Sequence, residues 1–141
     1  KLLVFILKNA ADTAVDGEPE LEAELSKQGQ FTVVILGMGD DGHTASLFPE
    51  TPALSETERW VTGNYVPKFD EHRITFTYPL INAARRVCFL VNGKAKRPIY
   101  EAIFAGDGNH FPAAHIAPAS GQQTWIIGTE AHLWFPSEIG I

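Results

Sequence analysis

Two short, almost wholly apolar runs constrain the fold of this chain more than any other feature of its sequence. Residues 31–36 read FTVVIL and residues 87–91 read VCFLV, and a glycine follows each run within two positions. A β-branched, apolar run of this length is typical of a strand covered on both faces. Such strands alternate here with helical segments, so the sequence predicts an α/β fold with a largely parallel sheet.

The remaining elements are expected around these two strands. Pro19 suits the first turn of a helix that ends at residues 28–30, and Pro49 and Pro52 limit residues 44–48 to at most two helical turns. The alternation of Ile74, Phe76 and Tyr78 with threonines indicates a strand. The other expected elements are a buried strand or helix over residues 2–7, strands over 60–66, 73–78 and 124–127, helices over 79–84 and 94–104, and mostly loop over 105–120.

Length, charge and cysteine content limit the classes of protein that the chain can represent. Its 141 residues suit a single α/β domain over residues 1–141. The formal net charge of −6 disfavours nucleic acid and anionic membrane surfaces as partners, and no apolar run is long enough to cross a bilayer. The single Cys88 fits a reducing cytoplasm.

The loop over residues 37–43, GMGDDGH, is the most informative stretch for chemistry. It leaves the carboxyl end of a predicted strand and is expected to enter a helix start, where α/β sheets place ligands and free amides bind anions. Asp41 and His43 flank a glycine, so both side chains can point into one cleft, where the carboxylate would fix the tautomer of an imidazole base. On spacing alone, a tight turn with a surface histidine is an equally good interpretation.

The same loop matches the dinucleotide-binding pattern GxGxxG through Gly37, Gly39 and Gly42. That pattern requires a long helix after the loop and an acidic residue at the end of the next strand. Pro49 cuts the helix short, and the next strand ends at residues 66–68 without an acid. NAD binding is therefore a weaker interpretation of this loop.

A locally basic segment lies in the second half of this acidic chain. Lys94 and Lys96 follow a predicted strand at its carboxyl end, so they can meet the 37–43 loop at one sheet edge and bind a phosphate there. For each lysine taken singly, a solvated helix end is the simpler interpretation. Residues 82–100 contain no acid and five basic residues, namely Arg85, Arg86, Lys94, Lys96 and Arg97.

Residues 37–49, GMGDDGHTASLFP, resemble the signature of the 6-phosphogluconolactonases. Shorter stretches agree in the same order, so the resemblance covers about residues 31–127. It implies the Rossmann-like three-layer sandwich that these enzymes share with glucosamine-6-phosphate deaminases. It also implies hydrolysis of 6-phosphogluconolactone to 6-phosphogluconate in the pentose phosphate pathway, without metal or cofactor. The five histidines show no metal-ligand spacing either.

By position, the resemblance implies roles for individual residues. His43 corresponds to the general base that activates water, and Asp41 to the residue that orients it. Lys96 corresponds to the lysine that holds the phosphate of the sugar lactone, and Arg73 to a recurrent arginine assigned more loosely to substrate binding. The other expected substrate-binding residues are Gly39, Gly42 and Thr44.

Two positions distinguish the lactonases from their deaminase relatives. Thr44 and Phe48 stand where the deaminases carry a bulky apolar residue and a glutamate, so the lactonase is expected and the deaminase/isomerase is the alternative. The lactonases are longer, and the chain is expected to be their C-terminal part, truncated at the N-terminus, with one sheet side open. A homodimer, or pairing with the missing N-terminal part, is then expected, and a non-catalytic sugar-phosphate-binding module is a second alternative.

Overall fold

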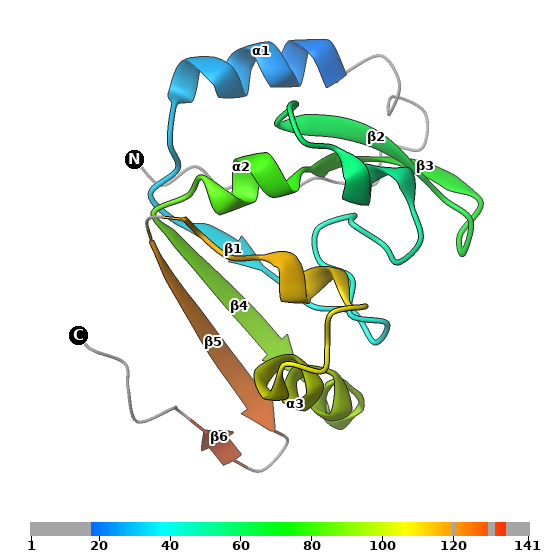
Figure 1. Cartoon of the computed structure of the whole chain (residues 1–141), viewed down its shortest axis with the longest axis vertical. Coiled ribbons are helices and arrows are strands. Elements are labelled where there is room, and N and C mark those ends of the chain that lie inside the picture. The colour runs from blue at the N-terminus through cyan, green and yellow to red at the C-terminus, as the bar shows by residue number, and fades with distance from the viewer. Residues whose placement is uncertain (1–17, 120, 130–131, 135–141) are drawn as a thin grey trace.

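The computed structural model describes residues 18–119, 121–129 and 132–134, which form two sheets and the helices around them (Figure 1). The apolar run over residues 2–7 lies outside this part of the chain. The helices are α1 (Glu18–Gln28), α2 (Tyr78–Asn82) and α3 (Arg97–Ala105), with short 3-10 helices η1 (Pro52–Ser55), η2 (Lys94–Lys96) and η3 (Pro112–His115). The strands are β1 (Val34–Leu36), β2 (Val61–Val66), β3 (Glu71–Phe76), β4 (Arg86–Asn92), β5 (Gln122–Thr129) and β6 (His132–Trp134).

The main sheet has the strand order β1-β4-β5-β6. Strands β1, β4 and β5 are parallel, with Val34 opposite Val87 and Phe89 opposite Trp125. Strand β6, which the sequence pattern did not indicate, adds antiparallel to β5. The predicted α/β fold with a mainly parallel sheet is therefore confirmed.

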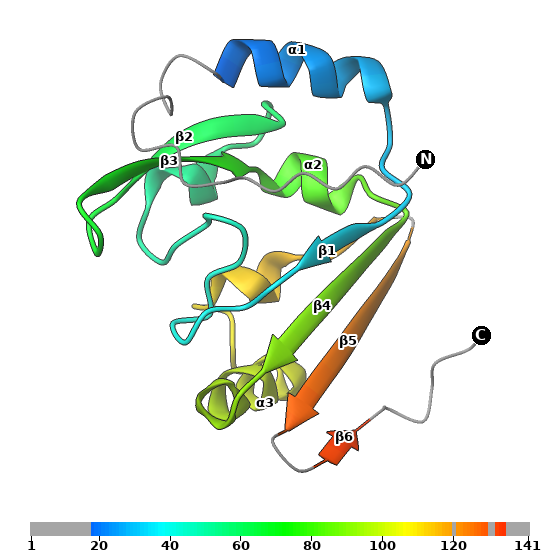
Figure 2. The same ribbon diagram turned by 180° about the vertical axis from the view of Figure 1, so that it is seen from behind.

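The described helices cover one face of this sheet (Figures 1 and 2). Phe89 is fully buried on the covered face and stacks on Trp125 with ring centroids 4.0 Å apart. On the opposite face Ile35 is 56% exposed and Leu90 is 49% exposed. The expectation that β1 is covered on both faces is therefore wrong for the described residues, which supply two layers of the expected three-layer sandwich.

Strands β2 and β3 form a separate antiparallel hairpin, with Val61 opposite Phe76 and Val66 opposite Glu71. Both strands were expected from the sequence, but they do not extend the parallel sheet. Residues 67–70 join them in a tight turn, which is too short for the crossover that parallel neighbours require. The hairpin projects beyond the main sheet and lies next to the loop after β1 (Figure 2).

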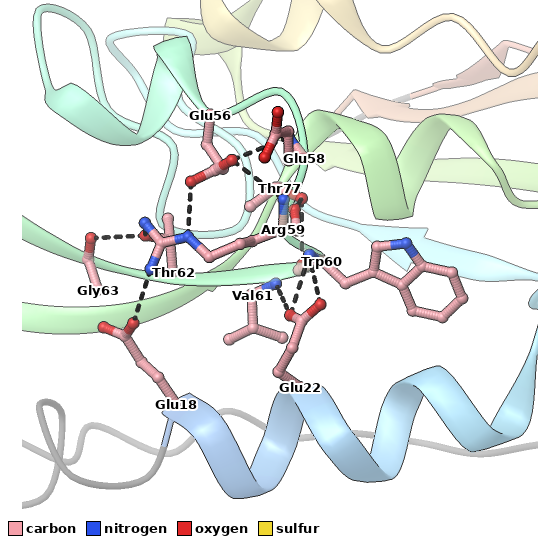
Figure 3. A network of polar contacts seen from close by, with 10 residues as sticks. All are labelled: Glu18, Glu22, Glu56, Glu58, Arg59, Trp60, Val61, Thr62, Gly63 and Thr77. Atoms are coloured by element: carbon pink, nitrogen blue, oxygen red, sulfur yellow. Dashed lines mark hydrogen bonds and ion pairs between the residues drawn. The ribbon is translucent and has the colours of Figure 1, made fainter.

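Helix α1 is attached to the start of β2 by charged groups (Figure 3). The Glu22 carboxylate accepts the backbone N–H of Trp60 at 2.9 and 3.0 Å and that of Val61 at 2.7 Å. Arg59 reaches Glu18 on the same helix at 3.5 Å. The apolar side of α1, including the fully buried Leu25, joins the main core.

No helix follows the 37–43 loop. Residues 44–48 form turns closed by an isolated bridge between Thr44 and Leu47, and Ala45 has a φ of +49°. The expected helix start is therefore wrong, and so is the expected anion site on its free amides.

The helix expected over residues 94–104 does form. The 3-10 helix η2 leads into α3, which has Pro98 in its first turn. Among the helices that the structure describes, none has the length and apolar character needed to span a membrane.

Candidate active site

A cavity of about 560 Å³ opens at the carboxyl ends of β1 and β4. The 37–43 loop follows β1, and η2 follows β4, so both reach this edge, as parallel strands require. Residue Arg73 enters from the separate β2–β3 hairpin. The cavity is lined by Ile35, Leu36, Gly37, Met38, Gly39, His43, Thr44, Ala45, Ser46, Arg73, Phe76 and Lys96.

His43 and Asp41 form a tight pair at the wall of this cavity. The imidazole Nδ1 lies 2.5 Å from Asp41 Oδ1, and the His43 backbone N–H donates to the same oxygen at 3.1 Å. Burial raises the pKa of Asp41, but hydrogen bonds from His43 and Lys68 outweigh it and lower the pKa to about 2. An anionic carboxylate can only accept, so Nδ1 carries a proton, and in the neutral form of the ring Nε2 has the free lone pair.

An apolar ring supports the imidazole from one side. Phe48 is 2% exposed and stacks on His43, with ring centroids 4.0 Å apart and an interplanar angle of 23°. Phe69 from the hairpin packs edge-on against Phe48 at 5.6 Å. The ring of His43 is therefore fixed by Asp41 in its plane and by Phe48 on its face.

Two glycines give this loop its shape. A Cβ on Gly39 would lie 2.0 Å from Nδ1 of His43, so any side chain there would displace the imidazole. Gly42 has a φ of +75°, and a Cβ on it would lie 2.5 Å from the ring of Phe111. The Gly39 N–H donates to the carbonyl of His43 at 2.8 Å, and that of Gly42 to the carbonyl of Gly39 at 3.2 Å. Substrate contacts by these two glycines stay a prediction.

Thr44 and Ser46 anchor the far side of the loop. The Thr44 hydroxyl, which is almost fully buried, donates to the carbonyl of Gly37 at 2.8 Å. The Ser46 N–H donates to the hydroxyl of Thr75 at 3.0 Å, which ties the loop to β3. Thr44 borders the cavity, and the expected contact with substrate stays a prediction.

Two cations from different elements border the same cavity as His43. The Arg73 guanidinium lies 4.7 Å above the ring of Phe69, and its Nη2 contacts Glu71 at 3.1 Å. Its Nε is buried and has no hydrogen-bond partner within the described residues. Lys96, half-buried in η2, is the second cation. A guanidinium and an ammonium at one cavity suit an anion such as a phosphate.

Comparison with known proteins identifies the family of this chain. The sequence model of the family described as glucosamine-6-phosphate isomerases/6-phosphogluconolactonase matches residues 4–125. The chain belongs to this family. The family resemblance of the 37–49 motif is thereby confirmed, and the site described above lies wholly within the matched residues.

Relatives and solved structures agree with this membership. A "Probable 6-phosphogluconolactonase" of Drosophila melanogaster is 45% identical over 120 residues, which are 84% of this chain and 48% of that protein. A "6-phosphogluconolactonase" of Synechocystis is 48% identical over 104 residues, or 72% and 42% of the two chains. The structure of "6-phosphogluconolactonase from Trypanosoma cruzi" matches with a TM-score of 0.72 at 28% identity, covering 86% of this chain and 52% of that one. The chain spans about half the length of the curated relatives it matches.

One site residue escaped the sequence analysis of this family member. Lys68, in the hairpin turn, places its Nζ 3.0 Å from Asp41 Oδ2 and 3.7 Å from Asp40 Oδ1. A basic residue directly after Pro67, between two strands, was the available signal. In the part of the chain that the structure describes, no three His, Cys, Asp or Glu side chains are arranged to hold a metal ion.

Proposed function

We propose that this chain carries the general base and the phosphate-binding cations of a 6-phosphogluconolactonase. The reaction is hydrolysis of 6-phospho-D-glucono-1,5-lactone to 6-phosphogluconate. The observation that carries the proposal is that His43, with Nδ1 held by Asp41, shares one cavity with Arg73 and Lys96. The names of the relatives and of the structural neighbours support the same activity.

The free Nε2 of His43 gives the chemical step. It takes a proton from a water molecule as the water oxygen forms a bond to the lactone carbonyl carbon. The resulting tetrahedral oxyanion collapses, and the bond between this carbon and the ring oxygen breaks. The imidazolium returns its proton to the departing ring oxygen, which becomes a hydroxyl. The new carboxylic acid then ionises, so one water is consumed and one proton is released.

The cations act at the other end of the substrate. A phosphate dianion placed against the Arg73 guanidinium and the Lys96 ammonium would gain charge-assisted hydrogen bonds, each worth about 1.5–3 kcal/mol. These contacts are the same before and during the chemical step, so they serve binding and orientation rather than bond breaking.

Replacing His43 by asparagine tests the proposed base. We expect kcat to fall about 10²- to 10⁴-fold, because a positioned general base contributes that much, while KM changes little. The measurement is acid release from the lactone in a pH-stat, corrected for spontaneous hydrolysis. His72→Asn, which removes an exposed histidine of β3 outside the cavity lining, is the matched control. An unchanged kcat in His43→Asn would reject His43 as the base.

The alternative activities give different signals in the same samples. A deaminase/isomerase would release ammonia from glucosamine 6-phosphate. The buried, apolar Phe48 favours the lactonase, since the deaminase relatives carry a glutamate there. Saturable binding of 6-phosphogluconate without turnover would instead indicate a sugar-phosphate-binding module.

We also propose a location and a partner for this activity. The single Cys88 fits a reducing cytoplasm. The exposed apolar side chains of Ile35 and Leu90 suit a cover on that sheet face, which is either a second copy of the chain or the N-terminal part implied by the resemblance.

A further inference from the structure

We propose that Lys68 is a positioning residue that fixes the carboxylate of Asp41 and thereby holds His43 in the tautomer that a general base requires. Lys68 lies in the turn between β2 and β3, outside the motif that carries the family resemblance. The proposal deepens the function proposed above and rests on it.

The geometry of Asp41 gives each carboxylate oxygen its own partner. Oδ1 accepts the Nδ1–H and the backbone N–H of His43, whereas Oδ2 accepts the Lys68 ammonium at 3.0 Å. An aspartate held only through Oδ1 could rotate about its terminal torsion, which is a broad and soft one. With Lys68 on Oδ2, such a rotation breaks a charge-assisted hydrogen bond. The lysine therefore fixes the orientation of the carboxylate.

The hairpin turn holds Lys68 in place for this contact. The turn is closed by backbone hydrogen bonds from Phe69 to Val66 at 3.1 Å and from Asp70 to Pro67 at 3.3 Å. Phe69, next in sequence to Lys68, packs edge-on against Phe48, the ring on which His43 stacks. An ionic contact and an aromatic contact thus join the turn to the two groups that fix the imidazole.

The contact is expected to affect the site more than the fold. The side chain of Lys68 is 50% exposed, and ion pairs of that kind add little to folding stability. The charged groups around the pair are Asp40, Lys68, Arg73 and Lys96. Of these, Lys68 is the one that hydrogen-bonds Asp41. Its loss would let the imidazole carry its proton on Nε2, where the ring can no longer accept one from water.

The first test uses no substrate. Ring-nitrogen NMR shifts of His43 are recorded at about pH 8 in the 141-residue chain as wild type, Lys68→Met and Lys68→Arg. We expect protonated Nδ1 in the wild type, a clear loss of that population in Lys68→Met, and its recovery in Lys68→Arg. Lys27→Met is the matched control, because Lys27 is an exposed lysine whose ion pair with Glu24 lies on α1.

The second test is kinetic. We expect kcat of Lys68→Met to fall about tenfold with KM unchanged, less than the roughly 10²- to 10⁴-fold contribution of the base itself, because the imidazole remains in the site. Salt at 1 M, where the screening length is about 3 Å, should lower kcat of the wild type towards that of the variant and leave the variant unaffected. The wild-type arm of this test needs no substitution, so an unchanged wild-type kcat at 1 M salt counts against the proposal even if Lys68→Met folds poorly.

The outcomes separate this proposal from the proposed function. An unchanged His43 spectrum in folded Lys68→Met overturns the positioning role and leaves the lactonase untouched. A changed His43 spectrum in Lys68→Met together with a wild-type kcat would show that Lys68 does not matter for catalysis. The expected spectra, together with no lactone hydrolysis by any form of the chain, would support the positioning role and count against the lactonase proposal alone.

Discussion

The carboxylate of Asp41 is charged at all but strongly acidic pH, although it is largely withdrawn from water. Burial raises its pKa, and the hydrogen bonds from His43 and Lys68 outweigh that effect and lower the pKa from 3.8 to about 2. A group with a depressed pKa stabilises the folded state above its unfolded pKa and loses that contribution as the pH falls through the folded value. The ionised Asp41 therefore contributes to the free energy of unfolding above about pH 4, and this contribution is lost as the pH falls towards 2.

Replacing Asp41 by asparagine should flatten this part of the pH dependence. In the wild type, the Asp41 carboxylate contributes about 2 kcal/mol to the free energy of unfolding near pH 6, and roughly half of that is lost by about pH 3. Urea unfolding of both proteins at these two pH values measures the difference. The backbone N–H groups of Arg59 and Glu58, with the Arg59 side chain, lower the pKa of Glu56 to about 2 as well. Glu56→Gln should therefore flatten the same pH range and serves as a positive control. An Asp41→Asn slope equal to that of the wild type would contradict the prediction.

The sequence predicted the part of the site that depends on neighbouring residues. Asp41 and His43 flank one glycine, so their contact follows from the local loop. Lys96 and Arg73 reach the same cavity, but their places were inferred from the family motif as well as from the sheet edge. Lys68 could not be predicted, because its contact with Asp41 spans 27 positions and depends on how the hairpin leans on the loop.

At the scale of elements, helix α1 and strand β2 are held together by one carboxylate. Glu22 accepts the N–H groups of Trp60, directly before β2, and of Val61, its first residue (Figure 3). A buried or half-buried donor left without an acceptor costs about 1–3 kcal/mol. The position of α1 is thus set by charge as well as by the apolar side of the helix.

Replacing Glu22 by alanine should destabilise the chain by about 2–4 kcal/mol, because two backbone donors lose their acceptor at once. Chemical denaturation measures this change in the free energy of unfolding. Glu20→Ala is the control, since Glu20 is an exposed glutamate in the first turn of the same helix. Equal losses in the two variants would show that Glu22 contributes no more than a surface glutamate.

The elements themselves were predicted unevenly, for physical reasons. Helix α1, strand β4 and helix α3 follow from apolar periodicity and proline positions, and their bounds agree closely with expectation. The helix expected over 44–48 does not form, because backbone groups there bond to Thr75 and within the turn instead. The sequence predicted the two strands of the hairpin, but a residue pattern does not indicate which strand another strand pairs with, so their separate sheet was not predicted.

At the scale of the whole molecule, the main sheet has one face in the core and one face in contact with solvent. Neighbouring residues of β4 lie on opposite faces, with Phe89 fully buried and Leu90 49% exposed. Both are apolar, so the sequence alone could not distinguish them. An apolar strand sequence indicates that both faces of the strand can be buried, but it does not indicate which part of the chain, or which partner, buries each face.

A pair of alanine substitutions measures how much the covered and the exposed face of β4 each contribute to folding stability. Phe89→Ala should cost about 3–5 kcal/mol, because it leaves a cavity against Trp125. Leu90→Ala should stay within about 0.5 kcal/mol in dilute solution. Thermal and chemical unfolding, repeated over a range of protein concentrations, gives both values. A large cost for Leu90→Ala that grows with concentration would show that a second copy covers this face.

The independence of the β2–β3 hairpin has a consequence for how substrate range could change. The hairpin contributes Arg73 and Phe76 to the cavity wall, yet it shares no strand ladder with the main sheet. Substitutions on its strands, away from the turn that holds Lys68, would therefore reshape the cavity wall without shifting the register between β1 and β4. The shape of the cavity can therefore change at these strands while the β1–β4 edge, which carries the 37–43 loop and Lys96, stays in place.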